Sequence, residues 1–67
     1  MRDFINDNTT EVRGKTTSIE ALRRAYKKER GPICRAEFRQ QVIDAGYEIV
    51  QIACGPALLL HRERRQP

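Results

Sequence analysis

Residues 19–46 read IEALRRAYKKERGPICRAEFRQQVIDAG, and this stretch decides the fold class. Its first part, residues 19–30, predicts a helix, because apolar side chains such as Leu22 and Tyr26 recur at helical spacing on one face. Lys and Arg occupy the opposite face. The Gly-Pro pair at 31–32 ends this helix, since Gly adopts a left-handed cap and Pro cannot continue the helical hydrogen bonding.

A second helix is predicted over residues 35–45, followed by a glycine that closes it. Phe38 and Val42 form its main apolar stripe, and Ala36 and Ile43 form a second apolar edge. Apolar contacts on two sides indicate a helix that lies between neighbouring elements. Only four residues separate the two helices, and so short a connection is typical of a helix-turn-helix pair.

The start of the first helix lies in Thr17-Ser18-Ile19-Glu20, which fits a capping box with the Thr17 hydroxyl on an early amide. The run before it, Gly14-Lys15-Thr16, resembles the end of a nucleotide phosphate loop. That loop needs a glycine at position 9, where this chain has Thr9, and it also needs a preceding buried strand. We therefore interpret Gly14 as a turn, and we expect no nucleotide cofactor.

The remaining segments predict a β-hairpin and a short N-terminal helix. YEIVQIA (47–53) and ALLLHRER (57–64) are rich in strand-forming residues and flank a Gly-Pro tip, which indicates arms of about six residues each. In DFINDNTT (3–10), Phe4 and Ile5 pack on the core, and an extended piece between Glu11 and Thr16 pairs with the hairpin. Residues 64–67 are expected to fray.

The order of these elements defines the predicted fold. It is an α+β winged helix-turn-helix, with two to three helices and a C-terminal hairpin as the wing, in one domain over residues 1–67. A chain of this length has a thin core and no room for a catalytic cleft between layers. No apolar run approaches the length of a membrane span, so we expect no membrane association.

The two cysteines indicate a reducing, cytoplasmic setting. Cys34 and Cys54 are too few for a secreted mini-protein and do not form a Cys-x-x-Cys pair, so we expect two free thiols that act as small buried hydrophobes. A disulfide between them remains the alternative. With His61 as the only histidine, the chain lacks a zinc ligand set. Neither His61 nor Ser18 has a catalytic partner in sequence, so we predict neither an enzyme nor a metal site.

The positive charge is concentrated in one segment. The chain has a net charge of +4, whereas residues 12–30 contain seven Lys or Arg and two Glu, a local net charge of +5. An excess of cations on one helix face is the electrostatic pattern of proteins that bind the phosphate backbone of nucleic acids. A solvated helix surface without a partner is the alternative interpretation.

The predicted contacts with duplex DNA come from three segments. Cations of the first segment contact phosphates, two Arg and a Gln of the second helix are of types that read base edges, and two Arg follow the wing. The wing tip at Gly55 and Pro56 enters an adjacent groove. The predicted DNA-binding residues are Lys15, Arg23, Arg24, Lys27, Lys28, Arg35, Arg39, Gln40, Arg62 and Arg64.

Most of the chain also resembles a known family. Phe4, Leu22, the Ala25-Tyr26 pair, Phe38 with Val42, and Gly46-Tyr47 are similar to the pattern of the winged-helix domain at the C-terminus of phage and plasmid primase-helicases. The resemblance implies a DNA-binding accessory domain of a replication or regulatory protein, either excised or free-standing. Because winged helices also bind proteins through the same surfaces, a protein-interaction module that docks on a replication or host protein is the second hypothesis.

Overall fold

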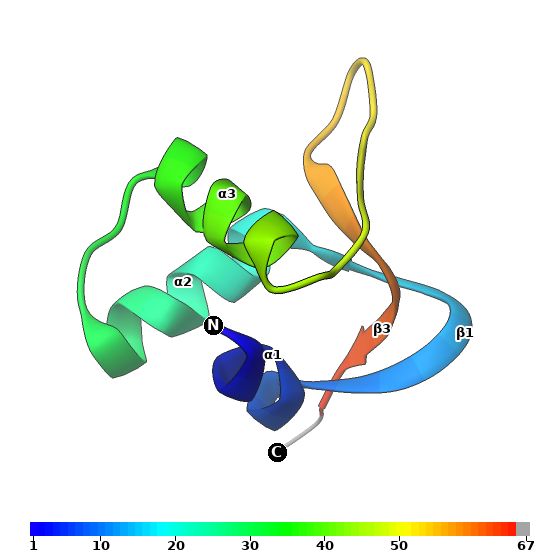
Figure 1. Cartoon of the computed structure of the whole chain (residues 1–67). Helices are drawn as coiled ribbons and strands as arrows, with labels where there is room; N and C mark the ends of the chain where they lie inside the picture. Colours follow the sequence, from blue (N-terminus) through cyan, green and yellow to red (C-terminus); the bar gives the residue numbers. More distant parts are fainter. Residues whose placement is uncertain (66–67) are drawn as a thin grey trace.

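The computed structural model describes residues 1–65, which form three helices and a three-stranded antiparallel sheet (Figure 1). The elements follow one another as α1 (Arg2–Asn8), β1 (Thr9–Ser18), α2 (Ile19–Arg30), α3 (Arg35–Asp44), β2 (Ile49–Gln51) and β3 (Ala57–Arg64). The α+β class and all six predicted segments are confirmed. This element order is compatible with a winged helix.

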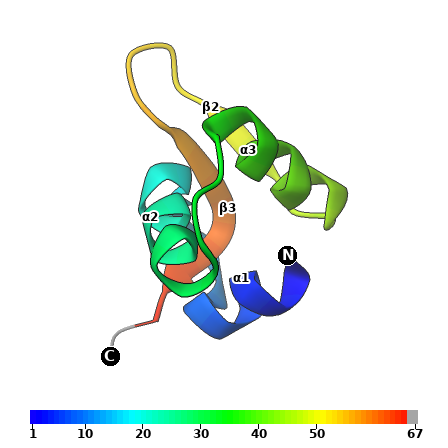
Figure 2. The same cartoon turned by 90° about the vertical axis from the view of Figure 1, so that its left-hand side faces the viewer.

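The sheet brings distant parts of the chain together. Its order is β1-β3-β2, so the C-terminal strand is central, with Thr17 opposite Leu59 on one side and Ile49 opposite Leu59 on the other. The helices gather beside the sheet, and the β2–β3 hairpin projects away from them (Figures 1 and 2). Figure 2 also shows α2 and α3 on opposite sides of the view, with the hairpin above and α1 below.

The core is small and is built around an aromatic cluster. Phe4, Tyr26 and Phe38 meet edge to face, with ring centroids 5.2 Å (Phe4–Tyr26), 6.3 Å (Phe4–Phe38) and 5.5 Å (Tyr26–Phe38) apart. Edge-to-face rings add attraction to the burial of their area. All the elements except β2 and β1 contribute buried apolar side chains, namely Phe4, Ile5, Ile19, Leu22, Phe38, Val42 and Leu59.

β1 is longer than predicted and contains a wide bulge. Its pairing with β3 passes from Glu11–Arg62 to Thr16–Leu60, so residues 12–15 lie opposite His61 alone. Gly14 has φ 86° and His61 has φ 59°, and the Gly14 N–H donates to His61 Nδ1 at 3.3 Å. A left-handed conformation costs little at Gly but is strained at His. The predicted turn at Gly14 is therefore a bulge inside a strand.

The N-terminal cap of α2 differs from the predicted capping box. Ser18 is the cap residue, and its hydroxyl accepts from the Ala21 N–H at 3.4 Å. The Thr17 hydroxyl instead donates to the Arg62 carbonyl at 2.8 Å, because Thr17 is still part of the sheet. Glu20 turns toward Arg23 and Arg35. The N-terminal cap of α3 is Cys34, whose Sγ accepts from the Glu37 N–H.

The hairpin is less regular than predicted. Its first arm is only three residues long, and residues 52–56 form the tip. Gln51 closes this tip, since its Nε2 donates to the carbonyls of Ile52 (3.3 Å) and Gly55 (3.1 Å). Pro56 has no N–H and cannot extend the ladder. At the other end, strand pairing reaches Arg64 and the Arg65 N–H donates to the Asn8 carbonyl, where a frayed end was predicted. Residues 66–67 lie outside the described part.

Two predictions about burial are wrong. Cys34 and Cys54 are free thiols, as expected, but both are exposed, because one caps a helix and the other lies on the hairpin tip. The second apolar edge of α3 is also uncovered. Ala36 is exposed and Ile43 is 45% exposed, because α2 and the sheet lie on the side of α3 that contains Phe38 and Val42.

Candidate nucleic-acid interface

A groove separates the first turns of α2 and α3 from the β2–β3 hairpin. Its volume is about 240 Å³, and we call it the α3–hairpin groove. It brings together the sides of two helices and the hairpin, whose lining residues lie 12 to 38 positions apart in the chain. The lining residues are Ile19, Glu20, Arg35, Arg39, Gln51, Gly55, Pro56 and Ala57.

Glu20 organises the cations at one end of the groove. Its carboxylate accepts two hydrogen bonds from Arg23, at 3.2 and 3.1 Å, and lies 2.8 Å from Arg35 Nε. The hydrogen bonds from Arg23 lower the pKa of the Glu20 carboxyl, the charges of Arg23, Arg35 and Arg24 act in the same direction, and partial burial opposes them. The Arg35 side chain remains 79% exposed, so its guanidinium is held at the groove but open to a ligand.

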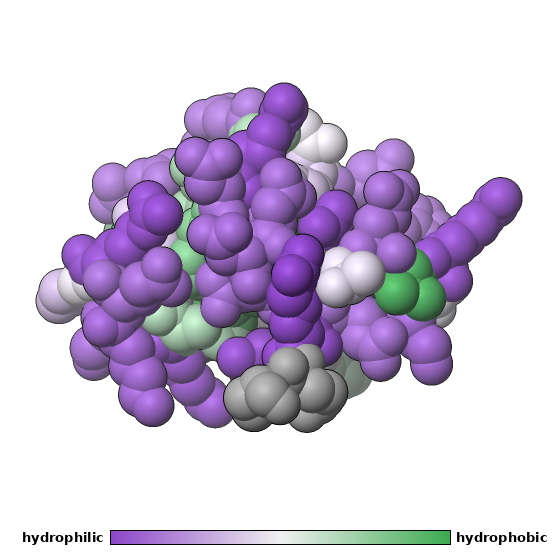
Figure 3. Space-filling view, turned by 90° about the horizontal axis from the view of Figure 1, so that it is seen from below, coloured by the Kyte–Doolittle hydropathy of each residue, from purple (hydrophilic) through white to green (hydrophobic). Residues whose placement is uncertain are grey.

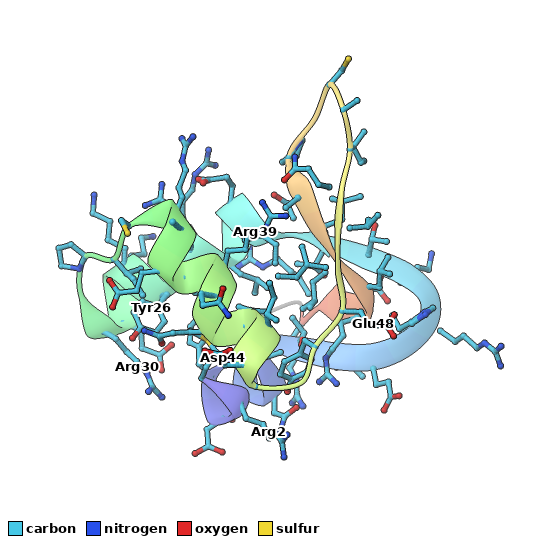
Figure 4. All side chains as sticks on the ribbon, turned by 45° about the horizontal axis from the view of Figure 1, so that its top comes forward. Arg2, Tyr26, Arg30, Arg39, Asp44 and Glu48 are labelled. Carbon is cyan, nitrogen blue, oxygen red and sulfur yellow. The ribbon has the colours of Figure 1, made fainter. Side chains whose placement is uncertain are left out.

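Arg39 lies at the middle of the groove. It points from α3 toward the hairpin (Figure 4), and its Nη1 donates to Gln51 Oε1 at 3.0 Å. The same Gln51 amide holds the hairpin tip through its Nε2. Arg39 and the tip are therefore positioned together. Gln40 lies one residue further along α3, is exposed, and donates to Asp44 Oδ1 at 2.9 Å.

Two of the predicted DNA-binding arginines have structural partners. Arg23, besides its bonds to Glu20, donates to the Ile33 carbonyl at 3.2 Å and thereby ties α2 to the connection before α3. Arg62 donates from Nε to Thr9 Oγ1 (2.8 Å) and from Nη2 to Asn6 Oδ1 (3.1 Å) and the Thr9 carbonyl (3.2 Å). Its guanidinium also lies 5.6 Å from the centroid of the Tyr47 ring.

The other predicted cations are exposed and distributed over three places. Lys27 lies on the same side of α2 as Glu20, seven residues after it. Arg24 and Lys28 face a different hollow, together with Arg64 from the end of β3. Lys15 is in the bulge of β1, and Figure 1 shows β1 curving away from α2 and α3. Within residues 1–65, the only salt bridges are those of Glu20 with Arg23 and Arg35.

The hairpin has an uncharged surface that the charge count over whole segments did not reveal. Residues 49–60 contain no Asp, Glu, Lys or Arg, and Val50 and Ile52 are 41% and 45% exposed. The face opposite the hairpin, seen in Figure 3, is by contrast mostly hydrophilic. Gln51 was also missed as a groove residue, because only the tertiary contact with Arg39 reveals its role. The absence of charged residues from 49 to 60 is the feature of the sequence that could have predicted this uncharged hairpin surface.

The described residues also bear on two other features, a metal site and a membrane-spanning helix. No group of three or more His, Cys, Asp or Glu side chains among residues 1–65 has a geometry that could hold a metal ion. None of the helices formed by these residues is long and apolar enough to cross a bilayer.

The chain matches no protein-family model, and no curated protein or solved structure is significantly similar to it.

Proposed function

We propose that this protein is a non-catalytic winged-helix domain that binds duplex DNA, with α3 as the reading helix and the β2–β3 hairpin as the wing. The observation that supports this most is the α3–hairpin groove, where Arg35, Arg39 and Gln51 converge beside an exposed helix face. The resemblance to winged-helix domains of phage and plasmid primase-helicases supports a role in replication or regulation.

The side chains at the groove have the chemistry for DNA recognition. Arg forms bidentate hydrogen bonds with guanine, and Gln with adenine, in the major groove. Arg35 and Arg39 are donors of this type, and Gln40, the next residue after Arg39, is exposed. The contacts of Arg39 with Gln51 and of Gln40 with Asp44 hold these groups in place, and each contact is exchanged for a base or phosphate when DNA binds.

The surplus of cations provides attraction over a longer range. Lys27 and Arg30, both exposed on α2, lack salt-bridge partners within residues 1–65, and the chain has a net charge of +4. Binding to phosphates releases counterions, so the affinity falls with salt by about 0.9 log units per log unit of salt for each phosphate contacted.

A titration of a fluorescent mixed-sequence duplex, followed by anisotropy at several salt concentrations, tests the proposal. We expect binding that is steeply salt-dependent and that Arg39→Glu weakens by about tenfold or more. Arg13→Glu is the matched control, because Arg13 lies exposed in the β1 bulge away from the groove and its reversal changes the net charge equally. Equal losses for the two variants, or no binding of the wild type at low salt, would reject the groove as a DNA site.

The uncharged wing favours a second candidate, a protein-interaction module. Val50 and Ile52 on the hairpin and Ile43 on α3 are exposed apolar side chains, which are a common feature of protein interfaces. This candidate predicts weak DNA binding and a stable partner protein. If this candidate is right, Ile52→Asp abolishes capture of that partner and Arg39→Glu does not. If the protein instead binds DNA at the groove, Arg39→Glu weakens DNA binding and Ile52→Asp does not.

A further inference from the structure

A second basic surface lies between α2 and the end of β3. Arg24 and Lys28 from α2 and Arg64 from β3 line a hollow of about 290 Å³, and Ala21 and Ala25 complete its lining. The four α2 residues are spaced three and four apart, so they share one helix face. We call this site the basic hollow. It shares no residue with the α3–hairpin groove.

The composition of the basic hollow suits a phosphate group. Three cations converge from elements that are 36 to 40 residues apart, and no acidic side chain lines the site. Like charges at such spacing repel one another. The acids nearest in sequence, Glu29 and Glu63, form no salt bridge with them in the described part of the chain, and Glu20, one turn before Arg24, pairs with Arg23 and Arg35 instead. The two alanines are the short side chains of the lining, so they leave room for an anion beside the longer cationic ones.

The position of the basic hollow separates it from the DNA at the groove. Arg23, on the side of α2 next to α3, donates to the carbonyl of Ile33 just before α3, whereas the face with Arg24 and Lys28 is turned toward the end of β3. Figure 2 shows α2 and α3 on opposite sides of the view. A stiff duplex that follows the outer face of α3 would have to bend around α2 to reach the hollow, at a cost of several kcal/mol.

We infer that the basic hollow binds backbone phosphates of a second DNA segment, so that one domain bridges two duplexes. The inference rests on the proposed function, because the first duplex is the one bound at the α3–hairpin groove. It assigns Arg24, Lys28 and Arg64 to the second segment. The same chemistry would accept free inorganic phosphate, and the test distinguishes the two sources.

A bridging assay tests the inference. A biotinylated duplex is fixed on beads, the protein is added, and retention of a second, fluorescent duplex is measured beside anisotropy with a single short duplex. We expect the wild type to retain the second duplex. Lys28→Glu lowers this retention by about tenfold or more and leaves the single-duplex affinity within about twofold of the Arg13→Glu control, which has the same net charge. Circular dichroism confirms that the variants are folded.

Four outcomes contradict the inference. In the first, Lys28→Glu weakens binding of a single duplex as much as Arg39→Glu does, which indicates one continuous surface. In the second, inorganic phosphate displaces the fluorescent duplex at a chloride-matched ionic strength, which indicates a small-anion site. In the third, the protein sediments as a dimer and Lys28→Glu still bridges. In the fourth, single-duplex binding is intact but the wild type does not bridge. Loss of all DNA binding would instead contradict the proposed function itself.

Discussion

Arg62 was predicted to contact DNA, but its hydrogen bonds in the structure indicate that it stabilises the fold instead. Replacement by Met, Arg62→Met, removes every N–H donor and keeps most of the aliphatic stem. The lost contacts join β3 to the end of α1 and the start of β1, across more than fifty residues of chain. We therefore expect the variant to be less stable and its DNA affinity, measured while it is folded, to be unchanged.

The magnitude follows from the individual contacts of Arg62. The 2.8 Å bond to Thr9 Oγ1 joins a half-buried guanidinium to a fully buried threonine, and a hydrogen bond to a charged group of this kind contributes about 1.5 kcal/mol. The two Nη2 bonds, one of them exposed, and the partly exposed Tyr47 contact add about 0.5 kcal/mol in total. The expected loss is about 2 kcal/mol, or roughly 8–16 °C in melting temperature for a domain of this size.

Thermal and urea unfolding, followed by far-UV circular dichroism, measures this loss. Arg24→Met is the matched control, since Arg24 is exposed and its substitution is expected to change the free energy of unfolding by less than about 0.5 kcal/mol. Anisotropy with a short duplex then compares the affinities of both variants. An unchanged melting temperature for Arg62→Met, together with a clear loss of DNA affinity, would refute the structural role and make Arg62 a DNA contact.

Three further predictions concern the core, the groove and the bulge. Phe38→Ala removes the ring that meets both Phe4 and Tyr26, so it is expected to cost about 3–5 kcal/mol and to leave the domain largely unfolded by circular dichroism at 25 °C. The pKa of the Glu20 carboxyl is lower in the folded state than in the unfolded state. The ionised Glu20 therefore stabilises the fold at pH values above its unfolded-state pKa of about 4.3, and this stabilisation is lost as the pH falls through the folded-state pKa. The melting temperature of Glu20→Gln therefore decreases less than that of the wild type between neutral and acidic pH, and its DNA affinity increases at neutral pH; a parallel decrease in both proteins contradicts this. His61→Val places a β-branched side chain at φ 59° and is expected to lower the free energy of unfolding by about 1 kcal/mol or more. His61→Gly is expected to change it by about 0.5 kcal/mol or less. Equal urea midpoints for the two variants would show that the conformation at His61 is not strained.

The features of this protein that the sequence determined are local ones. The bounds of α2, the end of α3 before Gly46 and the cap at Cys34 follow from contacts between residues at most a few positions apart. Such contacts depend on helical spacing and cap chemistry, which the sequence displays directly. The short N-terminal helix with Phe4 and Ile5 in the core was predictable for the same reason.

Only the tertiary structure decided which polar side chains are free. Arg23 and Arg24 are adjacent in sequence and equal in charge, yet one donates to Glu20 and the Ile33 carbonyl while the other lines the basic hollow. The pairing of β1 with β3 fixes Arg62 against Thr9 and brings Arg64 beside Lys28. These contacts join residues far apart in the chain, and closing so long a loop depends on the whole core rather than on any local pattern. The residue types therefore predicted a basic surface, and the fold divided it into a groove, a hollow and structural ion pairs.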